Sequence, residues 1–153
     1  MRLCRLLQLV VATALWAAAP TSIDAQPAPD RAGAERAALD YIEGFYEGDT
    51  VKLYRSVSPE VLKFGYSKGR DGSWQHVPFP WPSFGSFAAA VRAGRNLPPA
   101  NAPKRVVLYD VQEQIAAARV DAWWGMDYLL MARMDGRWKI THVLWQGPPP
   151  NNR

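Results

Sequence analysis

The chain is 153 residues long, which is enough for one domain with a hydrophobic core and too short for two domains of ordinary size. Its formal net charge is +4, and its arginines are scattered along the chain rather than clustered. Because nucleic-acid binding calls for a basic stripe with a readable motif, we expect no nucleic-acid partner.

The first 25 residues have the pattern of a secretory signal peptide. Arg2 and Arg5 precede an uncharged apolar stretch at residues 6–19, and Ala25 offers a small residue before a cleavage site at Gln26. We therefore expect residues 1–25 to be a signal peptide and the protein to be periplasmic or secreted. The apolar run is shorter than the roughly 20 residues of a membrane span, so a retained anchor is the alternative reading. After signal removal we expect no stable membrane insertion.

Removal of the signal peptide also removes the only cysteine, Cys4. A mature chain without cysteine has no disulfide, no thiol nucleophile and no thiolate metal ligand. Such a domain depends on its core for stability, and its Trp, Tyr and Phe residues are numerous enough to build one. The loss of Arg2, Arg5 and Asp24 leaves a net charge of +3.

Helical patterns occupy the first half of the mature chain. Prolines make residues 26–33 a linker in front of a domain that we place at residues 34–147, and residues 148–153 are predicted to be a disordered tail. Asp30 can cap a helix over residues 31–47, in which apolar residues recur at helical spacing. Gly48 ends this helix, and Asp49 caps a shorter one over residues 50–57. A third helix follows a Ser83 cap and ends at Gly94.

Strand patterns dominate the rest of the chain. Residues 61–66 are predicted to form a first strand, and residues 73–82 a strand edge that passes into an aromatic loop. Residues 105–112, 115–124, 126–134 and 137–146 follow, and Asp135-Gly136 between the last two is a strong hairpin signal. Helices followed by a meander predict an α+β fold, in which a curved antiparallel sheet wraps around the helices as a cone with an internal pocket.

Several of these residues occur in an order that resembles a known family. The resemblance rests on Tyr41, Gly48-Asp49, Asp127-Tyr128-x-Leu130 and Gly136-x-Trp138-Lys139-Ile140, and it spans Glu35 to Gln146. The pattern is similar to the Putative lumazine-binding family of the nuclear-transport-factor-2-like, or SnoaL-like, superfamily. The resemblance implies a helix-filled cone, often dimeric through its sheet, with a cavity for a small apolar molecule. Relatives include ketosteroid isomerases, polyketide cyclases, dehydratases and proteins without catalysis, so fold does not decide function.

The last hairpin is the predicted wall of the pocket. A two-residue turn at Asp135-Gly136 pairs Leu129 with His142 and Asp127 with Leu144. All of these residues would then share one apolar, concave face with Met131, Trp138 and Ile140. A bulge at the turn would shift the register by one residue and change the faces.

Asp127 and His142 are the candidate catalytic residues. Burial in an apolar cone raises the pKa of an aspartate, which suits a general base, and a neighbouring histidine could hold its charge or shuttle the proton. Alternatively, Asp127 bonds backbone or an arginine at the strand end, and His142 is an ordinary wall residue.

The predicted ligand-binding residues come from the helices, the aromatic loop and the hairpin. Tyr41 could project its hydroxyl into the cavity as an oxyanion donor, or could simply pack in the core. Trp81 lies in the aromatic segment 74–84, which also holds His76 and forms either a lid or a cover over a sheet edge. The full set is Tyr41, Trp81, Leu129, Met131, Trp138, Ile140 and Leu144.

Metal and cofactor signals are missing from the sequence. The two histidines are far apart and no carboxylate cluster accompanies them, so we expect no metal site. We also find no phosphate-binding glycine loop and no dinucleotide fingerprint, and we expect no cofactor.

Three functions remain open. The first is an exported domain that binds a small apolar or heteroaromatic ligand in its cone, with or without catalysis. The second is an isomerase, cyclase or dehydratase that uses Asp127 as general base. The third is a non-catalytic dimerisation or accessory domain. A homodimer is expected in each case.

Overall fold

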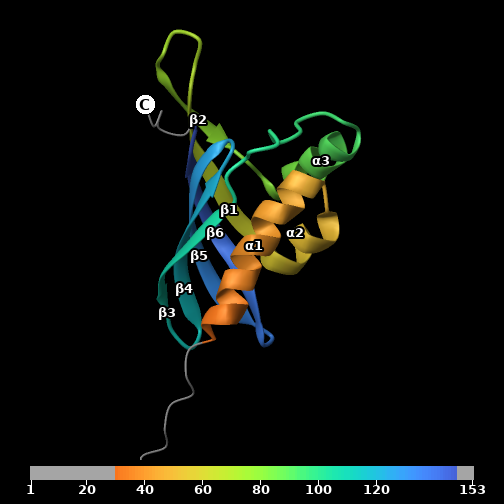
Figure 1. Ribbon diagram of the computed structural model, residues 1–153. Helices are drawn as coiled ribbons and strands as arrows, with labels where there is room; N and C mark the ends of the chain where they lie inside the picture. The colour runs from red at the N-terminus through yellow and green to blue at the C-terminus, as the bar shows by residue number, and fades with distance from the viewer. Residues whose placement is uncertain (1–29, 148–153) are drawn as a thin grey trace, which may run out of the picture.

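The computed structural model describes residues 30–147, and Figure 1 shows how its elements are arranged. Three helices and six strands follow each other as α1 (Arg31–Glu47), α2 (Thr50–Ser56), β1 (Val57–Lys68), β2 (Trp74–Pro78), α3 (Trp81–Arg92), β3 (Arg105–Val111), β4 (Ile115–Ala122), β5 (Gly125–Met134) and β6 (Arg137–Gln146). The predicted signal peptide and the predicted disordered tail lie outside the described residues. Within residues 30–147, no helix combines the length and the apolar character that a membrane crossing needs.

The strands form one curved sheet in the order β2-β1-β6-β5-β4-β3. Helix α1 lies along its concave side, with α2 and α3 beside it, so the predicted α+β cone is confirmed (Figure 1). The expectation of a purely antiparallel sheet is wrong at one pair, because β1 runs parallel to β6. Chain order explains this pair: β1 follows the helices and β6 is the last strand, so no hairpin joins them.

Capping residues set the ends of the first two helices. The Asp30 carboxylate accepts a hydrogen bond from the Gly33 amide at 2.9 Å, so α1 begins at Arg31, the predicted start of this helix. Gly48 ends α1 in the left-handed conformation, with φ of 68°. A Cβ at Gly48 would lie 2.6 Å from the Ala88 carbonyl oxygen, so glycine also allows α3 to approach. Asp49 caps α2 as predicted.

Helix α3 begins earlier than predicted. Pro80 is its N-cap residue and Pro82 lies in its first turn, where a missing amide proton costs nothing. The helix therefore starts at Trp81, and Ser83 lies inside it rather than capping it. As a result Trp81 belongs to a helix and not to a loop.

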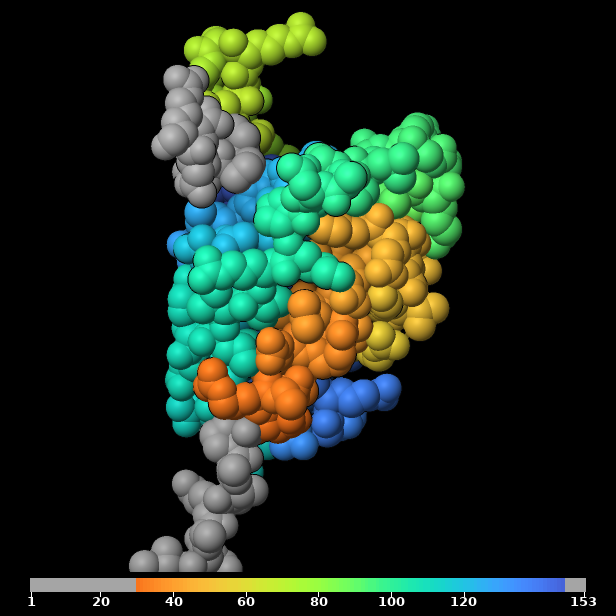
Figure 2. Space-filling view, viewed as in Figure 1, coloured from red at the N-terminus to blue at the C-terminus, as the bar shows by residue number. Residues whose placement is uncertain are grey.

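The core lies between α1, α3 and the concave face of the sheet. Its largest fully buried side chains include Tyr41 and Ile42 from α1, Phe84 from α3, and Leu129 and Ile140 from the sheet. In the space-filling view the sheet and α1 pack together without separating, and the tip of the β1–β2 hairpin projects beyond the body of the domain (Figure 2). The chain from α3 to β3 crosses the end of the cone nearest to that hairpin (Figure 1).

Candidate functional site: an aromatic cavity with a buried lysine

The last hairpin has the predicted turn but not the predicted register along its whole length. Asp135 and Gly136 have φ of 49° and 74°, which is the signature of a two-residue type I′ turn. Met131 pairs with Ile140 as expected, but the register then shifts, so that Leu130 pairs with His142. Thr141 is therefore the extra residue of a bulge in β6.

The bulge exchanges the two faces of β6 beyond Thr141. Val143 is buried and Trp145 is half-buried, whereas His142 and Leu144 are exposed. The predicted pairs Leu129–His142 and Asp127–Leu144 are wrong, because one inserted residue turns every later side chain to the opposite face.

His142 and Asp127 are consequently not brought together. His142 lies on the outer face of the sheet, between Leu62 of β1 and Leu130 of β5. Its Nδ1 lies 3.1 Å from the Thr141 hydroxyl oxygen. Asp127 faces inward and is fully buried. The structure thus separates the two predicted catalytic residues by the thickness of the sheet.

Asp127 is instead the centre of a buried polar cluster. The Tyr41 hydroxyl donates to its Oδ2, and the Trp124 Nε1–H donates to its Oδ1 at 2.8 Å. Lys63 Nζ lies 3.6 Å from the same Oδ2 and donates to the Tyr41 hydroxyl oxygen at 2.5 Å. We call Tyr41, Lys63 and Asp127 the buried triad. Both carboxylate oxygens of Asp127 therefore have partners.

Lys63 is the candidate site residue that the sequence did not reveal. Along β1, Val61, Lys63 and Gly65 are buried, and the more apolar Leu62 and Tyr66 are exposed. Alternation alone would place the apolar set in the core. The buried set is the other one because the outer face of this sheet is itself rich in apolar side chains. The only sequence signal for the burial of Lys63 was its position two residues after Val61, which places both side chains on the same face of the strand.

The buried triad is held in a site of low polarity. The Lys63 side chain is 5% exposed, and burial lowers its pKa, although the Asp127 charge opposes that shift. Burial also raises the pKa of Tyr41 well above its ordinary value, and the charge of Asp127 and the hydrogen bond to it act in the same direction. These effects favour the protonated Tyr41 hydroxyl, which donates to Asp127.

Aromatic rings surround the Lys63 ammonium. Its Nζ lies 4.6 Å from the ring centroid of Phe79, 4.8 Å from that of Phe45 and 5.8 Å from that of Trp124. Tyr41 and Phe84 complete the shell. A cation that has lost its water gains from such rings, because their faces carry negative charge density.

A cavity of about 240 Å³, partly open to solvent, adjoins this shell. It lies at the end of the cone where β2 and α3 meet the β4–β5 turn. Gly65 shapes one wall, because a Cβ there would lie 2.4 Å from the indole of Trp145. The lining residues are Phe45, Lys63, Val77, Phe79, Phe87, Trp123, Trp124 and Trp145.

None of the seven predicted ligand-binding residues is among these eight lining residues. Four of them (Leu129, Met131, Trp138 and Ile140) are buried in the hydrophobic core, which is filled by side chains of α1 and the sheet. Tyr41 does not line the cavity but contacts two residues that do, Lys63 and Phe45. Trp81 packs against Tyr54 and Phe84, and Leu144 is 44% exposed on the outer face.

The aromatic segment 74–84 is split between a strand and a helix. Residues 74–78 form the edge strand β2, and His76 is exposed beside the rings of Phe64 and Tyr66. Two of its members, Val77 and Phe79, line the cavity. Within residues 30–147, no group of three or more His, Cys, Asp or Glu side chains is arranged to hold a metal ion.

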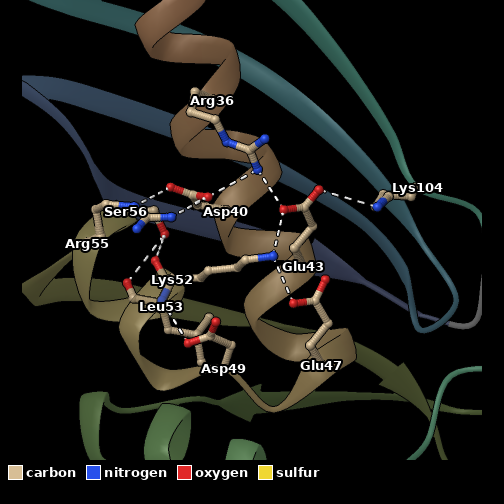
Figure 3. Close-up of polar contacts among 10 residues, drawn as sticks. All are labelled: Arg36, Asp40, Glu43, Glu47, Asp49, Lys52, Leu53, Arg55, Ser56 and Lys104. Carbon is tan, nitrogen blue, oxygen red and sulfur yellow. Dashed lines mark hydrogen bonds and ion pairs between the residues drawn. The ribbon is translucent and has the colours of Figure 1, made fainter.

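A second charged cluster lies on the surface between α1 and α2 (Figure 3). Asp40 accepts from the Arg55 guanidinium at 2.7 and 2.8 Å, and Arg36 lies 3.0 Å from it. Glu43 is in contact with Lys52 and with Lys104 of the chain before β3. We call this set the surface charge cluster. It joins α1 to its neighbours, and its members Arg36, Asp40 and Arg55 line a second pocket of about 210 Å³ together with Trp138.

Comparisons with known proteins agree with this fold. Residues 29–146 match the Putative lumazine-binding family. A search of curated proteins gave no match. Among solved structures, a nuclear-transport-factor-2-like protein of unknown function from Methylobacillus flagellatus is similar with a TM-score of 0.55 and 19% identity, covering 83% of this chain and 94% of that one.

Two further structures are similar to the same degree, and both are nuclear-transport-factor-2-like proteins of unknown function. The protein from Shewanella baltica has a TM-score of 0.54 and 16% identity, over 78% of this chain and 94% of that one. The protein from Silicibacter pomeroyi has a TM-score of 0.51 and 18% identity, over 74% and 92%. With the fold, the cavity and the family match in agreement, the chain belongs to the Putative lumazine-binding family and has the nuclear-transport-factor-2-like fold.

Proposed function

We propose that this domain binds a small, flat aromatic or heteroaromatic molecule in its aromatic cavity. The observation that carries the proposal is a cavity of about 240 Å³ walled mainly by aromatic side chains, with the buried Lys63 among them. Ligand sites in proteins have this composition: mostly apolar walls with a few placed polar groups that fix orientation. Because the cavity lies below the usual range of roughly 300–1,000 Å³, it suits a ligand of one or two rings.

Two donors favour a ligand that carries acceptor atoms. An ammonium has three N–H bonds, and the Tyr41 hydroxyl occupies only one of those of Lys63 at close range. The Trp145 Nε1–H is buried, and no residue in the part of the chain that the structure describes accepts from it. A buried donor without a partner is costly, so a ligand carbonyl or ring nitrogen at this wall would gain from filling it. A bicyclic heteroaromatic such as lumazine has both the shape and the acceptors.

Tryptophan fluorescence provides the test, because Trp123, Trp124 and Trp145 line the cavity. We expect lumazine to quench the fluorescence of the purified domain saturably. Val77→Phe adds bulk inside the cavity and should weaken binding. Val51→Phe is the matched control, since Val51 is 68% exposed on α2, and it should bind like the parent. Equal binding by both variants, or no binding of lumazine or naphthalene compounds, would contradict the proposal.

The general-base reading of Asp127 receives less support from the geometry. Asp127 does not line the cavity, and Lys63, Tyr41 and Trp124 lie in contact with its carboxylate. A proton taken from a ligand would have to pass through Lys63 or Tyr41.

We also propose that the outer face of the sheet binds a second copy of the chain. On this face Leu62, His142 and Leu130 form one row across three strands, and Phe64, Leu144 and Tyr128 form the next. Exposed apolar patches of this kind commonly mark interfaces between proteins. Native mass spectrometry should find a dimer, and Leu144→Lys should convert it to a monomer. A monomeric parent protein would contradict the dimer.

Export remains a proposal that follows from residues 1–25. The pattern predicts that the mature protein begins at Gln26 and accumulates outside the cytoplasm. The intact mass of protein recovered from the periplasm or medium tests this directly. A mass that retains residues 1–25 would contradict it.

A further inference from the structure

We propose that Lys63 is a carbonyl-reactive amine, which condenses reversibly with an aldehyde or ketone group of a ligand in the aromatic cavity to form a Schiff base. The inference rests on the proposed function, because the carbonyl compound must first enter the cavity. It adds a substrate class and a covalent site to that function.

The position of the Lys63 amine favours this reaction. Lys63 lines the cavity, and its Nζ lies within 4.6 to 5.8 Å of the ring centroids of Phe79, Phe45 and Trp124, which line the cavity too. An aromatic carbonyl compound stacked among these rings would therefore bring its carbonyl carbon to Nζ. Holding the two reactants together replaces a bimolecular step by an effectively unimolecular one.

The low polarity of the site also favours this reaction. With 5% of its side chain exposed, Lys63 has almost no water to stabilise the ammonium form. Burial lowers its pKa, against the opposing charge of Asp127, and so increases the share of free amine. Desolvation in an apolar pocket is a known way to activate a lysine as a nucleophile.

Tyr41 and Asp127 provide a path for the proton that Lys63 must lose. The Tyr41 hydroxyl accepts from Lys63 Nζ at 2.5 Å and donates to Asp127 Oδ2. Nζ also lies 3.6 Å from that same Oδ2. The ammonium proton can therefore move to Asp127 through the Tyr41 hydroxyl, which leaves a neutral amine and a neutral carboxylic acid. Tyr41 itself gains and loses one proton and is unchanged.

The reaction then proceeds in two balanced steps. The nitrogen lone pair forms a bond to the carbonyl carbon, the C=O π pair moves to oxygen, and a proton passes from nitrogen to that oxygen to give a carbinolamine. Asp127 next returns its proton through Tyr41 to the hydroxyl group, the C–O bond breaks, and water leaves as the C=N bond forms. The sum is an ammonium and a carbonyl giving a protonated imine and water, and no oxidant or reductant takes part.

The product suits the site as well as the amine does. A protonated imine keeps its positive charge on the Lys63 nitrogen, beside the Asp127 carboxylate and within the shell of aromatic rings. The interactions that hold the ammonium therefore also stabilise the product. Asp127 and Tyr41 act here as positioning and proton-transfer groups.

The other lysines in residues 30–147 lack this environment. Lys52 and Lys104 form ion pairs with Glu43 on the surface, and Lys139 donates to the Tyr54 carbonyl oxygen. Lys68 is the matched comparison: it lies on the same strand with its Nζ 5.4 Å from the ring of Trp74, but it is exposed. Lys63 and Lys68 thus both have an aromatic neighbour, but only Lys63 of the two is buried beside Tyr41 and Asp127.

Reductive trapping tests the proposal. The mature protein is incubated with 2-naphthaldehyde and sodium cyanoborohydride, and the adduct is located by intact mass and peptide mapping. We expect one naphthylmethyl group on Lys63, formed at least about tenfold faster than on any other lysine because the cavity holds the aldehyde beside the amine. Lys63→Arg and Lys63→Met should lose this adduct, and Lys68→Arg should keep it. Tyr41→Phe should slow formation of the Lys63 adduct without weakening the binding of the corresponding alcohol, 2-naphthalenemethanol.

2-Naphthalenemethanol separates the two proposals, because it has the same ring system and no carbonyl group. If the alcohol quenches tryptophan fluorescence saturably but the aldehyde labels Lys63 no faster than Lys68, the Schiff base is overturned and ligand binding stands. If neither compound binds, the cavity proposal fails first. Circular dichroism shows whether each Lys63 variant is folded, and the use of two variants keeps the test valid where one of them is unfolded. Labelling of Lys63→Arg equal to that of the parent would overturn the assignment of the adduct to Lys63.

Discussion

Two charged clusters share helix α1 and differ in their access to water. Tyr41 contacts the sheet and belongs to the buried triad, whereas its neighbour Asp40 contacts α2 and belongs to the surface charge cluster. Lys63 and Asp127 have side chains that are 5% and 0% exposed, while Arg36 and Arg55 are each about half exposed. The two clusters therefore begin at adjacent positions of one helix, but the basic partner is buried in one cluster and reaches solvent in the other.

The medium decides what each cluster contributes. In an exposed ion pair the two charged groups replace some of their water contacts with a contact to each other, and such a pair contributes about 0.2–1 kcal/mol. A buried pair pays a large desolvation cost, so its net contribution is small, but losing one partner leaves an unpaired buried charge and costs about 3–5 kcal/mol. The surface charge cluster thus fastens helices together, while the buried triad holds the Lys63 amine in place at the wall of a cavity.

Removal of Asp127 should produce the largest effect. Asp127→Ala leaves Lys63 buried without its counter-charge, and we expect the free energy of unfolding at pH 7 to fall by about 3–5 kcal/mol. Urea denaturation followed by circular dichroism measures this. The double variant Lys63→Met, Asp127→Leu removes both charges and should recover most of the loss. A double variant less stable than Asp127→Ala would contradict the account.

Asp40→Asn should give a smaller loss on the surface side of α1. Asp40 is 3% exposed and accepts two hydrogen bonds from Arg55, but both arginine partners reach solvent. We expect the free energy of unfolding to fall by about 1.5–3 kcal/mol, the usual value of a hydrogen bond to a charged group. The same urea experiment applies. A loss as large as that of Asp127→Ala would mean that burial of the basic partner does not affect the cost of removing the aspartate.

Glu43 should show the smallest effect and a clear pH dependence. Burial raises the pKa of Glu43, but the combined contacts with Lys52, Lys104 and Arg36 outweigh this effect and lower the pKa from 4.5 to about 2. A depressed pKa in the folded state stabilises the protein above the unfolded pKa, and this stabilisation is lost as pH falls from about 5 to about 2. Because its partners are solvated, we expect Glu43→Gln to cost about 1 kcal/mol or less at pH 7.

Comparing Glu43→Gln with the parent from pH 7 to pH 2 checks both the size and the direction. The difference in unfolding free energy should shrink below pH 5, and 1 M salt should reduce it at pH 7 as well, because salt screens exposed charges. A difference that grows on acidification would contradict the assigned contacts. The buried triad should respond little to salt, which sharpens the contrast between the two clusters.

Local patterns were sufficient for most of the fold. The N-caps at Asp30 and Asp49, the C-terminal Gly48 and the Asp135-Gly136 turn all occur as predicted, because each depends on a few neighbouring residues. The four C-terminal strands also agree with their predicted ranges to within a few residues. Two errors, the start of β1 and the parallel pair β1–β6, lie where distant segments decide, whereas the start of α3 is set locally by Pro80 and Pro82.

The candidate site was predictable only in part, through Asp127. Its burial followed from its place in an alternating strand. The bulge at Thr141 has no local signal, since no glycine or proline marks it, and it moved His142 to the other face. Lys63 was hidden because its strand has the more apolar residues on the outside.

The amino-acid sequence by itself determined the helices, the strands, the final turn and the family, because capping, periodicity and turn geometry act over a few residues. The tertiary structure alone decided which charged side chain faces the cavity. That choice depends on the register of β6 after its bulge and on which face of β1 the helices cover, and both follow from packing between segments far apart in the chain. Asp127 was expected to work with His142, and packing gave it Tyr41 and Lys63 instead.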